Sequence, residues 1–118
     1  MIYLDNAATT ALSPATIESM TKALAVFGNP SSPHSHGREA NKLLRQARED
    51  IAKVLHTQSK NILFTSGGTE SNNTAIKGYA LHHQAQGKHI VTTAIEHHAV
   101  LEPVEYLVER FGFEATIV

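Results

Sequence analysis

Apolar residues recur at two different spacings along this chain of 118 residues, and the change between them predicts the order of its elements. In the N-terminal half, apolar positions lie three or four residues apart, which is the period of an amphipathic helix. One such stretch begins at Ser13-Pro14 and is expected to end at Gly28, and a longer one runs from about Gly37 to His56. The chain between them is rich in Pro, Ser and Gly, so we expect a loop there.

The C-terminal half alternates between strand-like and helix-like segments. Short apolar runs predict strands at residues 61–65, 89–93 and 113–118, and longer amphipathic stretches predict helices at 69–86 and 100–111. This order predicts an α/β fold with a parallel sheet and crossover helices. The loops that follow the strands would then open at one carboxyl edge, where ligands bind in open α/β sheets.

A segment from Thr65 to Asn73 is the densest cluster of glycine, hydroxyl and amide side chains in the chain. Gly67 and Gly68 join a predicted strand to a predicted helix, whose first N–H groups lack partners at the positive end of the helix dipole. An anion suits that position, and glycine lets it approach the backbone. Three hydroxyls can add hydrogen bonds to its oxygens: those of Ser66, Thr69 and Ser71. The alternative is an ordinary turn with a Ser or Thr N-cap.

His97 lies in the loop after the next predicted strand, so the topology brings an imidazole to the same sheet edge. The GxxxxGK[ST] and GxGxxG fingerprints are absent, which disfavours ATP and NAD as ligands. A smaller cofactor with a phosphate and a flat aromatic ring fits better, and pyridoxal phosphate has that shape. The alternative for His97 is a core or loop histidine that backbone hydrogen bonds hold in place.

Composition and charge exclude several classes of partner. The net charge is −1 and there is no basic run, which argues against a protein that binds nucleic acid or anionic membranes. No long apolar span and no signal-peptide pattern are present, so a cytoplasmic location is expected. The chain holds no cysteine, hence no disulfide, thiolate ligand or cysteine nucleophile lies within these residues. Its paired histidines lack metal-binding spacing, so no metal site is expected.

Four motifs in order along the chain closely resemble the cysteine desulfurases. They are Tyr3–Thr10, Gly28–Arg38, Phe64–Asn73 and Glu96–Leu101. Cysteine desulfurases are pyridoxal-phosphate enzymes of the class V aminotransferase-like group, and the resemblance extends from Tyr3 to the last predicted strand. It implies that the chain is part of the large domain of a fold-type-I enzyme. We expect an N-terminal arm at residues 1–13 and a partial cofactor domain at 14–118 that is cut in mid-strand.

The resemblance also implies roles for individual residues. Gly68 and Thr69 match residues that bind the cofactor phosphate, in agreement with the anion site expected from the helix terminus. His97 matches a residue that stacks on the pyridine ring and assists proton transfer, whereas His98 has no assigned role. The loop from Asn29 to Arg38 is expected to border the site and the subunit contact.

The implied reaction takes sulfur from L-cysteine and leaves alanine and an enzyme persulfide. The sulfur then passes to an acceptor or scaffold protein for iron–sulfur cluster or thiolated-cofactor assembly, and the full-length enzyme is expected to be a homodimer. The reaction needs a lysine that binds the cofactor, an acidic partner for the ring nitrogen and a cysteine. None of these is identifiable in the sequence, so these residues alone are expected to be inactive.

The sequence is also compatible with two other functions. One is a non-catalytic module that binds phosphate ligands or docks to a partner through an exposed strand edge. The other keeps the enzyme class and changes the substrate, as in a selenocysteine lyase or another class V transferase.

Overall fold

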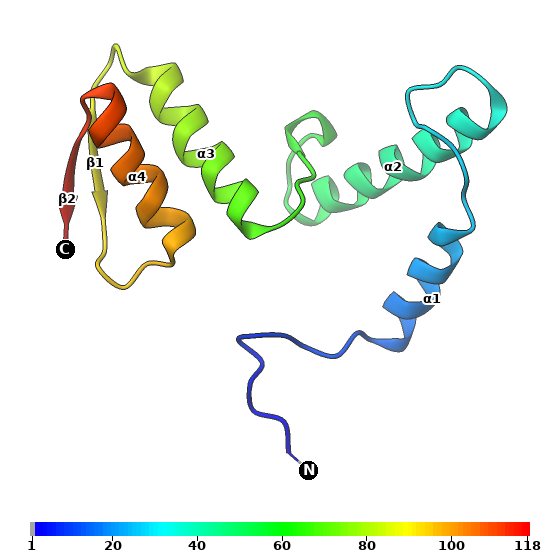
Figure 1. Ribbon diagram of the computed structural model, residues 1–118. Coiled ribbons are helices and arrows are strands. Elements are labelled where there is room, and N and C mark those ends of the chain that lie inside the picture. The colour runs from blue at the N-terminus through cyan, green and yellow to red at the C-terminus, as the bar shows by residue number, and fades with distance from the viewer. Residues whose placement is uncertain (1) are drawn as a thin grey trace. The chain divides into compact units, whose positions relative to one another are not determined.

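The computed structural model describes residues 2–118 (Figure 1). Contacts along the chain divide it into two compact units, Met1–Leu63 and Phe64–Val118, called unit 1 and unit 2 below. Unit 1 contains two α-helices and a 3₁₀ turn, and unit 2 contains two α-helices and the sheet. None of the helices in the described part of the chain is long and apolar enough to cross a membrane.

The first helix of unit 1, α1, spans Pro14–Leu24. The Oγ of Ser13 accepts the N–H of Thr16 at 3.1 Å, and Pro14 occupies the first turn, as the sequence predicts. The helix ends four residues before Gly28, so the expected end was wrong. The backbone N–H of Ala25 bonds to carbonyls of the last turn, and the large apolar side chains of Leu24 and Phe27 are exposed. Without packing, the apolar pattern does not extend the helix.

The second helix, α2, spans Ser35–Val54, two residues ahead of the expected range at each end. His34 is its N-cap, and its Nδ1 accepts the N–H of Gly37 at 3.3 Å. Gly37 itself is buried against the preceding loop. The sequence placed His34 in a loop and the helix start near Gly37, because histidine is not among the usual N-cap residues.

The expected strand at residues 61–65 is not formed. Asn61 ends a 3₁₀ turn that spans Ser59–Asn61, and its N–H bonds to the carbonyl of Gln58 at 2.9 Å. Ile62 has extended backbone angles, but no neighbouring strand pairs with it in the described residues. An apolar run becomes a strand only where another strand satisfies its backbone, so the local pattern was insufficient here.

Unit 2 holds the parallel sheet. Its elements follow the order α3 (Gly68–His83), β1 (His89–Thr92), α4 (His98–Phe111) and β2 (Glu114–Ile117). The two strands pair in parallel with His89 opposite Glu114, and α4 is the crossover between them. The predicted α/β fold with parallel strands and a crossover helix is therefore confirmed, with the sheet reduced to two strands in the described residues.

The core of unit 2 lies beneath α4. Leu107 and Pro103 are fully buried, and Val104 and Phe113 are each 5% exposed. Gly112 ends the helix at a φ of 66°, in the left-handed region that favours glycine, and this turn directs Phe113 back onto the helix. Packing on one apolar face thus fixes α4 against the sheet.

Candidate functional site

The N-terminus of α3 lacks the side-chain cap that the other three α-helices have. Gly67 is its N-cap residue and offers no side chain, whereas Ser13, His34 and His97 accept backbone N–H groups at the starts of α1, α2 and α4. The first N–H groups of an α-helix have no partner within the helix, and the dipole adds positive potential there. Together these features make the start of α3 suitable for an anion.

Both glycines at this helix start face open space. A Cβ built on Gly67 or Gly68 would have no contact within 4 Å, apart from the adjoining residues and the helix's own backbone. The chain's own packing therefore does not require glycine at either position. An absent Cβ leaves the backbone amides open to a ligand, which is the arrangement that a phosphate needs.

Two of the three hydroxyls expected to bind phosphate are already engaged. The Oγ of Ser66 donates to Glu70 Oε2 at 2.6 Å. The Oγ of Ser71 lies 2.6 Å from Thr65 Oγ1, which itself donates to the carbonyl of Gly67. Since each hydroxyl has one proton to donate, Ser66 and Ser71 have none left for a ligand, and that expectation was wrong for this conformation.

Thr69 is the hydroxyl residue that stays available. It is exposed in the first turn of α3, and its carbonyl, not its hydroxyl, is bonded to the side chain of Asn73 at 3.0 Å. Thr69 and Gly68 are therefore adjacent, exposed and at the helix start. The sequence singled out both positions, and nothing in the local packing conflicts with a role in binding.

Glu70 is a residue that the sequence reasoning did not single out. Its carboxylate accepts both the Oγ and the backbone N–H of Ser66, each at 2.6 Å. These two hydrogen bonds, that of the Ser66 side chain first, lower the pKa of Glu70 below its usual value. The signal was available, because an acidic residue three positions after an N-cap is a known helix-start pattern. Glu70 holds the turn before α3 in its bent form.

His97 is the N-cap of α4 and is exposed. Its Nδ1 accepts the N–H of Ala99 at 3.0 Å, and its carbonyl accepts the N–H of Val100 at 2.8 Å. The expectation that His97 and His98 both lie in a loop was wrong, because α4 begins at His98. The alternative expectation, a histidine held by backbone hydrogen bonds, is met at Nδ1 only. The rest of the imidazole ring is exposed.

Packing brings the starts of α3 and α4 to one end of unit 2. The two helices lie side by side and run in the same direction, and the loop after β1 leads directly into α4 (Figure 1). Gly68 and Thr69 begin α3 and His97 caps α4, so all three lie at the end of the unit where β1 and β2 terminate. Two positive helix ends at one edge favour an anionic ligand.

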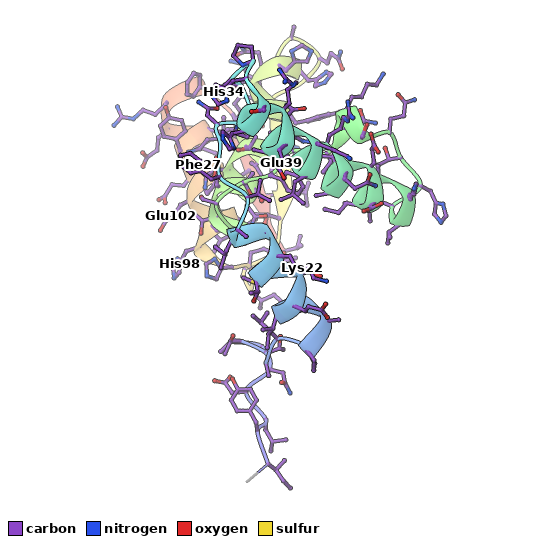
Figure 2. All side chains as sticks on the ribbon, turned by 90° about the vertical axis from the view of Figure 1, so that its right-hand side faces the viewer. Lys22, Phe27, His34, Glu39, His98 and Glu102 are labelled. Carbon is purple, nitrogen blue, oxygen red and sulfur yellow. The ribbon has the colours of Figure 1, made fainter. Side chains whose placement is uncertain are left out.

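Other histidines do not join this group. His98 and Glu102 are one turn apart along α4, where both are exposed (Figure 2). His83 packs against Tyr79 with ring centroids 4.3 Å apart at the far end of α3. Within residues 2–118, no three His, Asp or Glu side chains are grouped so that they could hold a metal ion.

Comparison with protein families gives a match to the aminotransferase class-V model over residues 2–118. The chain is also similar to part of each of two enzymes. It is 54% identical over 116 residues to the cysteine desulfurase IscS of Dictyoglomus turgidum, and 47% identical over 119 residues to an IscS-like cysteine desulfurase of Mycobacterium tuberculosis. Each match covers 98% of this chain, which spans 29% and 30% of those two proteins.

Solved structures agree with the sequence matches. A NifS-like protein superposes with a TM-score of 0.84 at 41% identity, over 94% of this chain and 30% of that one. A structure described as SspA in complex with cysteine gives 0.82 at 39% identity, over 95% and 32%. The resemblance to cysteine desulfurases that the four motifs indicate is thus confirmed for the sequence and for the fold. The chain belongs to the class-V aminotransferase family.

Proposed function

We propose that this chain carries the phosphate-binding and ring-stacking part of a cysteine desulfurase site that takes pyridoxal 5'-phosphate. Gly68 and Thr69 would hold the phosphate at the start of α3, and His97 would face the ring. One observation carries the proposal. The start of α3 has no side-chain cap and two glycines that face open space, at the end of the unit where α4 also begins with the exposed His97 as its N-cap.

The residues present fit a phosphomonoester. The uncapped amides at the start of α3 can donate to phosphate oxygens, and the Thr69 hydroxyl adds a further donor. The Glu70 carboxylate lies in the same turn, but its acceptor Oε2 is bonded to Ser66 and so stabilises the loop. Its charge still opposes a dianion, which places more of the binding on the helix dipole and on backbone amides.

Bound pyridoxal phosphate would supply an electron sink for bond cleavage at the substrate's amino acid carbons. The residues of this chain have simpler tasks. Gly68 and Thr69 anchor and orient the anionic end, so that the ring is presented at a fixed depth. His97 would cover one face of the ring and would hold a proton on its exposed nitrogen for exchange with a bound amino acid.

The proposed substrate is L-cysteine, supported by relatives that are named cysteine desulfurases and by the neighbour described in complex with cysteine. These 118 residues contain no cysteine and span about 30% of such relatives, so the proposal assigns them binding and not sulfur transfer. A sulfur-acceptor or iron–sulfur scaffold partner and a homodimer belong to the same proposal through the family. A cytoplasmic location belongs to the same proposal.

A titration of the protein with pyridoxal phosphate tests the binding part. Thr69→Ala removes one donor to a charged group and is expected to weaken binding by roughly 1.5–3 kcal/mol. His97→Ala should weaken it as well. Thr57→Ala is a matched control, because Thr57 is exposed in unit 1, where its hydroxyl bonds to Asn61. Unchanged affinity in both site variants would remove the site assignment.

A second function is favoured by one specific observation, the lack of a cysteine in these residues. The chain could then bind a phosphate ligand without catalysing sulfur release. Mixing these 118 residues with pyridoxal phosphate and L-cysteine tests whether they catalyse sulfur release by themselves. We expect binding without sulfide release. Sulfide release from the wild-type chain, absent in His97→Ala, would show that it is catalytic by itself.

A further inference from the structure

One nitrogen of the His97 imidazole is already committed within the chain. Nδ1 lies 3.0 Å from the backbone nitrogen of Ala99 and accepts its N–H. A ring nitrogen that accepts a hydrogen bond carries no proton, so a neutral imidazole in this position holds its single proton on Nε2. The bond also fixes the rotation of the ring about its side-chain torsions.

The first turn of α4 depends on this bond more than is usual for a helix. Pro103 is buried in the second turn and has no N–H, so the carbonyl of Ala99 receives no hydrogen bond from the residue four positions later. The first turn of α4 therefore lacks one of its backbone hydrogen bonds, the one that would end on the Ala99 carbonyl. The side-chain cap from His97 supplies an additional bond at the same residue, through the Ala99 N–H.

Histidine at this position combines two capacities. Ser, Thr, Asp and Asn are the favoured N-cap residues, and each could accept the Ala99 N–H. None of them also carries a second nitrogen that can hold or release a proton. A histidine N-cap can therefore satisfy the helix through Nδ1 while Nε2 stays available, and the exposure of His97 agrees with this division.

We infer that α4 fixes the His97 imidazole as the Nε2–H tautomer, with Nδ1 bound to the Ala99 amide, so that Nε2 is the nitrogen that exchanges a proton with a ligand. Ala99 is then a positioning residue, because its N–H acts on the ligand only through the ring. The tautomer follows from the helix start alone. The direction of proton exchange rests on the proposed function.

The ¹⁵N spectrum of the histidine side chains tests the tautomer directly. In the intact protein labelled with ¹⁵N-histidine and free of cofactor, at a pH where the ring is neutral, His97 should show an unprotonated Nδ1 and a protonated Nε2. His97→Asn identifies its signals by their loss, and through-bond correlation to the backbone does so without a variant. A proton on Nδ1, or rapid averaging of the two nitrogens, would overturn the inference.

Hydrogen exchange at the Ala99 amide adds a matched pair of variants. His97→Asn keeps an acceptor near the place of Nδ1 and should preserve slow exchange at Ala99, whereas His97→Ala should speed it roughly fivefold, the equivalent of one hydrogen bond. Equal exchange in the wild type and His97→Ala would contradict the cap. His34, which caps α2 through Nδ1 in the same way, serves as an internal reference for the ¹⁵N signature.

Cofactor binding then separates this inference from the proposed function. We expect both His97→Asn and His97→Ala to weaken pyridoxal-phosphate binding, although the first retains the cap. Unchanged affinity in both variants would refute the ligand role of His97, while an Nε2–H signature in the wild type would still establish the tautomer. A loss of affinity in His97→Ala that His97→Asn restores would refute the role of Nε2, since the cap alone would then account for binding.

Discussion

Glycine serves opposite purposes at the starts of α2 and α3. In unit 1, a Cβ added to Gly37 would lie 2.2 Å from the carbonyl oxygen of Ser32 and 2.8 Å from that of Asn29. In unit 2, a Cβ added to Gly67 or Gly68 would meet nothing within 4 Å. The fold therefore requires glycine at Gly37, whereas packing does not require it at Gly67 or Gly68.

The hydrogen bonds of the two loops show the same difference. The loop before α2 is tied to its own helix, since Asn41 Nδ2 donates to the carbonyl of Pro30 at 3.1 Å and His34 caps the first turn. The loop before α3 uses its hydroxyls and Glu70 to hold the turn, but leaves the helix start without a side-chain cap. The loop before α2 satisfies the start of its helix with its own side chains, whereas the loop before α3 leaves the helix start open to an anionic ligand.

The largest effect is expected from Gly37→Ala, which tests the first half of this comparison. The added methyl group overlaps backbone atoms that cannot move without breaking the loop, so we expect a loss of about 3 kcal/mol in the free energy of unfolding. Urea denaturation measures it. A loss below 1 kcal/mol would mean that the loop is not packed as described.

Gly68→Ala tests the second half. It should change the free energy of unfolding by no more than about 1 kcal/mol, because its methyl group enters open space at a helix start. Affinity for pyridoxal phosphate should fall by about tenfold, or about 1.4 kcal/mol, because the methyl group takes space that the phosphate needs.

Gly78→Ala is the matched control for this variant. Gly78 lies within the same helix and also faces open space, so alanine there should stabilise α3 by about 0.5–1 kcal/mol. Affinity should stay unchanged. Equal affinities for the two alanine variants and the wild type would remove Gly68 from the site.

Asn41→Ala sharpens the comparison from the side of unit 1. Loss of the bond from Asn41 Nδ2 to the Pro30 carbonyl should cost about 1 kcal/mol of stability. Thermal denaturation detects this change. An effect on pyridoxal-phosphate affinity without any change in stability would contradict the view that the loop before α2 is held for structural reasons.

Glu70→Gln should have the smallest effect, visible as a change in pH dependence. The folded pKa of Glu70 lies below its unfolded value, so its ionised form stabilises the turn above the unfolded pKa, and this contribution is lost as pH falls through the folded pKa. The wild type should therefore lose slightly more stability than Glu70→Gln on acidification below the usual range of a glutamate pKa. Parallel curves of stability against pH would contradict this assignment.

The sequence predicts most of the fold where local signals coincide. Ser13-Pro14 marks the start of α1 correctly, and the helix predicted at residues 100–111 is α4, with an error of two residues at its start. That error has a physical cause, because His97 is an uncommon N-cap residue. The strand expected at 61–65 fails for a different reason. Its backbone is extended at Ile62, and pairing with another strand is a tertiary event that a local pattern cannot specify.

The candidate site was predicted only in part. Gly68, Thr69 and His97 were singled out from turn chemistry and from the family motifs, and the structure places all three at one end of unit 2. The sequence could not tell which hydroxyls stay available. Ser66 was equivalent to Thr69 by composition, and its hydrogen bond to Glu70 depends on the shape of the turn.

The most direct test follows the backbone amides of the ¹⁵N-labelled protein during a titration with pyridoxal phosphate. We predict that the amide signals of Gly68, Thr69 and Glu70 shift together and saturate, and that inorganic phosphate shifts the same signals more weakly. Saturation with these three amides unmoved, while signals elsewhere in the protein shift, would contradict the claim that the uncapped start of α3 holds the phosphate.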